Sequence, residues 1–220
     1  AAELVETTRL FGRGIANIEP PWLEEVGGHL LKKQLLEPHW EKKAQDVIAF
    51  ERATLYGLVV YTGRRKSVSG LVGGDGMKMR QYCLRGEAMS GGYVSEVIAE
   101  ALSMAESNAC MCRIVAAPTA GACGVLPAVL LPLCRYEELS QHQLLEALYV
   151  ASGIGAVIAY RACIAGASGG CQAEIGTASA MAAGALVALL GGSGEQIGHA
   201  VAMALKNLMG LICDPVAGLV

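Results

Sequence analysis

Two short motifs, Ser168–Glu174 (SGGCQAE) and Cys213–Val220 (CDPVAGLV), bracket an Ala-rich stretch of this 220-residue chain. Each motif sets a cysteine among glycines or beside a proline, where the backbone bends. The stretch between them predicts a helical excursion whose two ends return to one place. Thiolates on bent backbone favour a soft metal centre, either zinc or an iron–sulfur cluster. The alternative is that Cys171 and Cys213 are small buried apolar residues, a common role of free cysteine.

The composition favours a mainly α fold. Apolar residues make up 53% of the chain but aromatic residues only 5%, and there are 28 glycines. Interiors built from small residues let helices approach one another closely. One stretch, residues 50–61, instead has the β-branched and aromatic character of a strand. We therefore expect a helical domain preceded by a small mixed α/β segment.

The charge distribution predicts two domains, residues 1–66 and residues 67–220. The first holds ten Lys/Arg against nine Asp/Glu, whereas the much longer second holds seven against eleven. The net charge of −3 does not indicate a nucleic-acid-binding protein as a whole.

Cysteine content and hydropathy bear on the location of the protein. Eight cysteines without a recognisable signal peptide predict a reducing cytoplasm. Residues 175–194 carry no charge, which raises the alternative of a membrane span. Because glycines and serines interrupt this run, we interpret it as a buried core helix and expect no membrane partner.

Helical spacing and capping residues predict four main helices. They cover residues 90–109, 138–159, 178–190 and 193–209, the third ended by a Gly-Gly pair. A further helix is expected from Met77, with Asp75 as its cap after a glycine-rich loop that could hold an anion or be a plain connection. Thr119 lies in a small-residue stretch and predicts either a ligand-holding turn or a helix N-cap.

Four motifs give the chain a specific resemblance. They are APTAG at residues 117–121, GGCQAEIG at 169–176, LKNL at 205–208 and CDPVAGLV at 213–220. With these motifs, residues 67–220 resemble the α, or iron–sulfur, subunit of bacterial L-serine dehydratases. The resemblance implies a helical catalytic domain that converts L-serine to pyruvate and ammonia. It also implies a partner β subunit or a homo-oligomer.

The same resemblance assigns the site residues. It implies a [4Fe–4S] cluster held by Cys171, Cys213 and a third cysteine expected in a short V-P-C element after Val220, so that the chain as given ends before it. Thr119 and Gly121 are expected to hold the substrate carboxylate.

Weaker candidates complete the predicted site. Ser69, with Ser67, is a second candidate for contacting the substrate, and His199 is the candidate general base or, alternatively, a core histidine. Pyridoxal phosphate chemistry would need a lysine, and Lys206 is the only lysine after Lys78. Residues 161–166 read RACIAG where relatives have NASISG, which places a cysteine, Cys163, beside the cluster motif.

Residues 1–66 carry a different resemblance. The motifs LFGR at 10–13, EPHW at 37–40 and FERATLYGL at 50–58 are similar to the region after the motor domains of bacterial DEAH-box RNA helicases. No phosphate-binding loop accompanies them, so no ATPase activity is implied. RNA contact by this segment is the alternative function, and a chimeric chain is one interpretation of the joint near residue 66.

Overall fold

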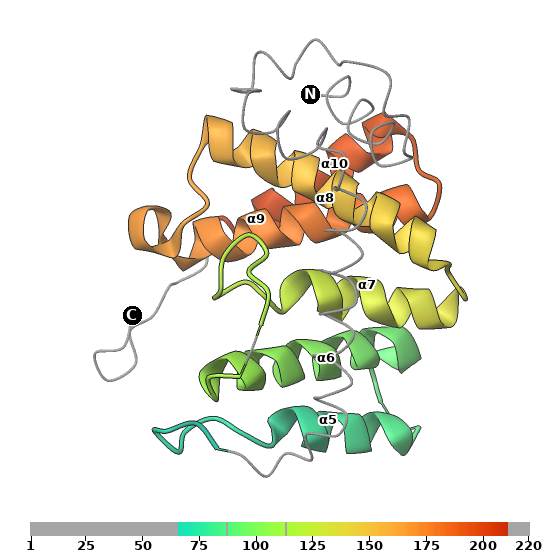
Figure 1. The fold of residues 1–220 in the computed structure, drawn as a ribbon. Helices are drawn as coiled ribbons and strands as arrows, with labels where there is room; N and C mark the ends of the chain where they lie inside the picture. Colours follow the sequence, from blue (N-terminus) through green and yellow to red (C-terminus); the bar gives the residue numbers. More distant parts are fainter. Residues whose placement is uncertain (1–65, 87, 113, 211–220) are drawn as a thin grey trace. The chain divides into compact units, whose positions relative to one another are not determined.

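The computed structural model describes residues 66–86, 88–112 and 114–210. Within these ranges the chain forms helices and no strand (Figure 1). The predicted strand at residues 50–61 and the predicted ligand Cys213 lie outside the described residues. The mainly α prediction is confirmed. The predicted boundary between residues 66 and 67 falls at the edge of the described part and stays a prediction.

The chain divides into two compact units, and the division crosses a helix. Of the described residues, those up to Leu145 belong to one unit and those from Glu146 onward to the other. We call them the first and the second unit in chain order. The helix that crosses the division, α8, runs over Gln141–Arg161.

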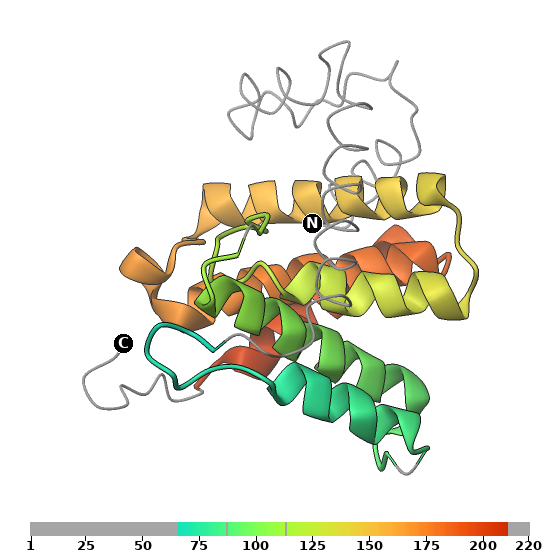
Figure 2. The ribbon, with the colours of Figure 1, turned by 60° about the horizontal axis from the view of Figure 1, so that its bottom comes forward.

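The first unit is built on α5 (Asp75–Leu84), α6 (Gly91–Ala109) and α7 (Val125–Tyr136). Helix α6 packs against α5 and against α7, and Figure 2 shows the three side by side. The predicted helix over residues 90–109 is confirmed as α6. Its N-terminal neighbour α5 begins earlier than expected, with Gly74 rather than Asp75 at the cap position.

Helix α6 does not bury all of the apolar residues whose spacing predicted the helix. Val94 and Ile98 are substantially exposed, while Glu100, Ser103 and Ser107 are buried. The buried hydroxyls are satisfied within the helix, since Ser103 Oγ donates to the Ala99 carbonyl and Ser107 Oγ to the Ser103 carbonyl. Self-satisfied serines are small, so they allow the neighbouring helices to come close.

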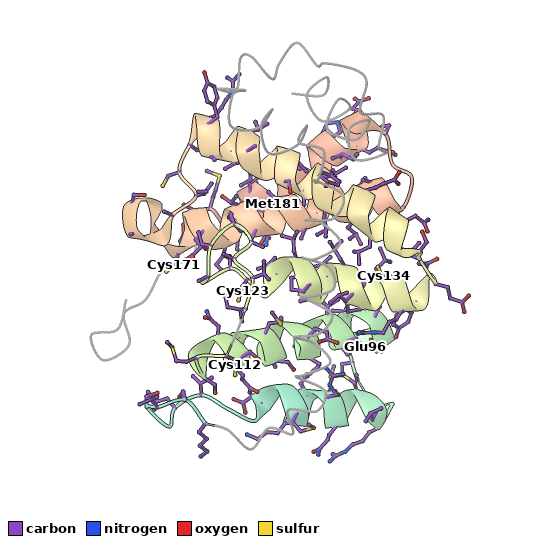
Figure 3. All side chains as sticks on the ribbon, viewed as in Figure 1. Glu96, Cys112, Cys123, Cys134, Cys171 and Met181 are labelled. Carbon is purple, nitrogen blue, oxygen red and sulfur yellow. The ribbon has the colours of Figure 1, made fainter. Side chains whose placement is uncertain are left out.

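The second unit is built on most of α8, on α9 (Gly166–Leu189) and on α10 (Gly194–Leu208). Helix α9 buries small residues at nearly consecutive positions from Gly176 to Ala185, more than one helical face can supply. It is therefore covered on more than one side. Met181 of α9 meets α8 near Gly155 (Figure 3), and Gly184 meets Ile154 of α8 and Val201 of α10.

Local sequence signals set the ends of these helices. Ser193 accepts a hydrogen bond from the Gln196 N–H while the Gln196 side chain accepts one from the Ser193 N–H, a capping box that starts α10. The Gly-Gly pair ends α9 as predicted, with Gly191 at φ 78°. Among the described residues, no helix is long and apolar enough to cross a membrane. The buried residues from Gly176 to Ala185 support the interpretation of residues 175–194 as a core helix for the part within α9.

Candidate functional site

The cysteine of the SGGCQAE motif lies on a bend. Cys171 is exposed and is the sixth residue of α9, directly after Gly170, whose φ of 79° and ψ of 169° interrupt the helix (Figure 3). An L side chain at position 170 would be strained by this backbone, although a Cβ there would have nothing within 4 Å. The structure therefore presents an exposed Cys171 on bent backbone, as expected from the sequence.

The hairpin of α9 and α10 brings its outer ends together. A Cβ at Gly176 would lie 3.7 Å from Leu208 Cδ1 and 3.9 Å from Leu205 Cδ2. Gly176 is five positions after Cys171, and Leu208 is five positions before Cys213. The part of α9 around Gly176 and the end of α10 therefore lie side by side, as the sequence predicts for a helical segment whose two ends come together.

The same hairpin places His199 far along α9 from Cys171. His199 lies between Ile197 and Val201, which pack against Gly184. From position 171 to 184 a helix rises about 20 Å, at 1.5 Å per residue. His199 is exposed, with Nε2 3.7 Å from Glu195 Oε1 on the same helix. This separation argues against His199 as the base for a substrate held at Cys171.

A second thiol lies against the cysteine motif. Cys163 Sγ is 2.7 Å from Ser168 Oγ, and the Ala165 N–H donates to the same sulfur at 3.4 Å. A Cβ on Gly169 would lie 3.3 Å from Cys163 Sγ. The Ser168 hydroxyl, followed by the Ala165 backbone, lowers the pKa of the Cys163 thiol below its ordinary value. The sequence marked Cys163 only as a difference from its relatives and did not predict its contact with Ser168.

In the first unit, Ser69 belongs to a self-contained loop. Ser67 Oγ lies 2.9 Å from Ser69 Oγ, and the Val72 N–H donates to Ser67 Oγ at 3.2 Å. The Ser67 N–H donates to the Val72 carbonyl at 2.8 Å and closes the loop. The hydroxyls of both candidate serines therefore organise the backbone of their own loop, which leads into α5.

Thr119 and Gly121 lie in the turn before α7. The Ala117–Pro118 peptide bond is cis, and the Ala117 N–H donates to the Thr119 carbonyl at 3.2 Å. Thr119 is half-buried and Gly121 is exposed. Helix α7 begins at Val125 with Gly124 at its cap position, so the alternative of Thr119 as an N-cap is wrong.

At the start of α5, where the glycine-rich loop could hold an anion or be a plain connection, the N–H groups are occupied from within the chain. Glu106 Oε1, from the last turns of α6, accepts hydrogen bonds from the Asp75 N–H and, at 3.0 Å, from the Gly76 N–H. Two residues later, Asn108 Nδ2 donates to the Ala120 carbonyl at 3.0 Å. The loop of Ser69 and the turn of Thr119 are thereby both attached to the C-terminal end of α6. Neither Glu106 nor Asn108 stood out in the sequence.

The described residues contain no group of three or more His, Cys, Asp or Glu placed to hold a metal ion. The candidate residues fall in both units, with Ser69, Thr119 and Gly121 in the first and Cys171 and His199 in the second.

Comparison with known proteins identifies the family. The family described as serine dehydratase alpha chain matches residues 32–220. The chain belongs to this family. The match includes residues 32–66, more than half of the segment compared above with helicases. The helicase resemblance therefore stays a prediction only.

Curated relatives agree with this assignment. The chain is 45% identical over 184 residues to the probable L-serine dehydratase alpha chain of Bacillus subtilis (strain 168), covering 84% of this chain and 60% of that protein. It is 43% identical over 150 residues to the L-serine dehydratase alpha chain of Peptoniphilus asaccharolyticus, covering 68% of this chain and 51% of that one. The chain thus spans about half to three fifths of these relatives. No solved structure matches it.

Proposed function

We propose that this chain carries the catalytic part of an iron–sulfur L-serine dehydratase, a lyase that converts L-serine to pyruvate and ammonia. The observation that carries the proposal is the exposed Cys171, set on the Gly170 bend in a chain of the serine dehydratase alpha family.

The residues fit one corner of a [4Fe–4S] cluster. Cys171 offers the soft thiolate that such clusters require, and the position beside it is open. Further thiolates would come from residues outside the described part, and Cys213 is the proposed second ligand. The α9–α10 hairpin supports this choice, because Gly176 and Leu208, each five positions from one of the two cysteines, lie together.

The cluster, when bound, supplies an iron that acts as a Lewis acid toward the substrate hydroxyl and eases its departure as hydroxide. The chain's own residues would hold the substrate for this loss. Thr119 offers a hydroxyl, and the backbone near Gly121 offers N–H groups to a carboxylate. Loss of the α-proton and of hydroxide gives aminoacrylate, which tautomerises to an imine and is hydrolysed to pyruvate and ammonia. His199 is not used in the proposal.

Reconstitution with iron and sulfide under anaerobic conditions tests the ligands, in the chain continued through the third cysteine expected after Val220. We expect a broad absorbance near 400 nm that Cys171→Ala abolishes and that Cys83→Ala, a half-buried cysteine on α5, leaves in place. Equal absorbance from both variants would refute Cys171 as a ligand. Thr119→Ala should keep the absorbance and raise the KM for serine about tenfold or more, the loss of one hydrogen bond to a charged group.

The remaining predictions concern partners and location. We propose a companion chain for this protein, because the named relatives are alpha chains, or else a homo-oligomer. A cytoplasmic location is proposed from the cysteine content. If residues 1–66 bind RNA, the full chain should bind RNA with an affinity that falls as the salt concentration rises, and the bound RNA should contact this segment.

A further inference from the structure

Polar contacts help to attach helix α5 to α6. Of its residues only Gly76 is fully buried, while Met77, Met79, Tyr82 and Cys83 are half-buried. The Glu106 carboxylate accepts from the first two backbone N–H groups of α5, and Arg80 Nη2 lies 3.4 Å from Glu100 Oε1. A carboxylate at a helix N-terminus makes charge-assisted hydrogen bonds that also match the helix dipole.

Whatever fixes the start of α5 also fixes the loop that precedes it. Residues 67–72 are closed on themselves by the Ser67 and Ser69 hydroxyls, with Val68 and Leu71 facing outward. Only Gly73 and Gly74 separate this closed loop from α5. Glu106, a residue of another helix, therefore also holds the point where this loop enters α5.

Asn108 does the same for the turn of Thr119. Its side-chain amide donates to the carbonyl of Ala120, the residue between the two proposed carboxylate-holding positions. A backbone carbonyl held from outside fixes the peptide plane that it shares with the N–H of Gly121. One end of α6 thus holds the turn that the proposed function assigns to the substrate and the loop of Ser69, the weaker candidate from the sequence.

We infer that Glu106 and Asn108 are positioning residues that hold the Ser69 loop and the Thr119 turn in the arrangement that receives the substrate carboxylate. This inference rests on the proposed function. Neither side chain needs to touch the substrate. Glu106 acts through the backbone of residues 75 and 76, and Asn108 acts through the peptide unit of Ala120 and Gly121.

Hydrogen exchange of the full chain tests the first half without any activity. Glu106→Ala should speed exchange of the Asp75 and Gly76 amides about tenfold or more, the equivalent of losing one hydrogen bond to a charged group. Glu106→Gln keeps an acceptor oxygen and should restore most of the protection. Lys78→Ala, which removes the exposed ion pair with Asp75 on α5, is the matched control and should leave these amides unchanged.

Kinetics of the reconstituted enzyme test the second half. We expect Glu106→Ala and Asn108→Ala each to raise the KM for serine about tenfold, with the absorbance near 400 nm unchanged and with rescue by Glu106→Gln. Exchange of residues 75 and 76 that is equal in Glu106→Ala and Lys78→Ala would overturn the role of Glu106. An unchanged KM in Asn108→Ala would overturn that of Asn108. If the wild-type chain, continued through the third cysteine expected after Val220, turns over no serine, the proposed function fails, while the exchange result still decides whether Glu106 attaches the start of α5.

Discussion

Arg135 Nη2 lies 2.9 Å from Glu100 Oε1, and this contact joins α7 to the buried carboxylate of α6. Glu100 is 2% exposed, and its other oxygen, Oε2, is buried with no hydrogen-bond partner among the described residues. The same guanidinium nitrogen lies 3.1 Å from Oε2 of Glu96. A buried carboxylate with one unpaired oxygen depends heavily on the partners of the other oxygen.

Removing that partner should destabilise the fold. In Arg135→Ala, Glu100 keeps only the 3.4 Å contact with Arg80, so we expect a loss of about 3 kcal/mol in the free energy of unfolding. Urea denaturation measures this loss. Glu96→Gln is the control, because Glu96 is partly exposed and its pair should contribute about 0.5 kcal/mol. Similar losses of unfolding free energy in Arg135→Ala and Glu96→Gln would contradict the stabilising role of the Arg135–Glu100 pair.

In the second unit, a methyl group added at Gly184 should destabilise the packing of α9 against α8 and α10. A Cβ there would lie 2.3 Å from Ile154 Cδ1 and 3.1 Å from Val201 Cγ2. Gly184→Ala should therefore cost about 1–3 kcal/mol through overpacking, as measured by thermal or urea unfolding. At Gly198 of α10 a Cβ meets nothing within 4 Å, so Gly198→Ala should instead stabilise the helix by about 0.5–1 kcal/mol. We expect Gly184→Ala to lower the free energy of unfolding and Gly198→Ala to raise it. Equal changes in the two variants would refute the overpacking at Gly184.

The bend beside Cys171 should also resist substitution. Gly170→Ala introduces no steric clash, but it places an L side chain at φ 79° and ψ 169°, which costs about 1–3 kcal/mol. We expect lower stability and weaker absorbance after iron reconstitution. At Gly176 a Cβ would meet only ordinary contacts with Leu205 and Leu208, so Gly176→Ala is the matched control. A Gly170→Ala variant as stable as this control would show that the bend is not required.

The thiol of Cys163 should react at lower pH than an ordinary cysteine. Because the folded state lowers its pKa through Ser168 and then Ala165, the thiolate form stabilises the fold. That contribution is present above the ordinary pKa and is lost as the pH falls through the lowered one. Alkylation of Cys163, followed by peptide mass spectrometry over pH, should shift to higher pH in Ser168→Ala. Ser152→Ala, which removes a surface hydroxyl bonded to the Leu148 carbonyl, should leave the profile unchanged.

The sequence by itself determined several of the helices and the bend at Cys171. It missed α7, and it placed the start of α9 at residue 178 rather than at Gly166. Helical spacing located α6 and α10, and the Gly-Gly pair ended α9, because these signals act within a few residues of the chain. The glycines before Cys171 predicted bent backbone for the same local reason. The motifs around it also identified the family that the comparison then established.

Only the tertiary structure decided what each helix buries and what each polar group binds. The buried face of α6 holds Glu100 and serines, because arginines pair with one oxygen of Glu100 and main-chain carbonyls accept hydrogen bonds from the serine hydroxyls. Glu106 fills the N-terminus of α5 from 30 residues away, and the hairpin separates His199 from Cys171. These are contacts between residues distant in sequence, and no local propensity encodes which partner will neutralise a charge or fill a cap.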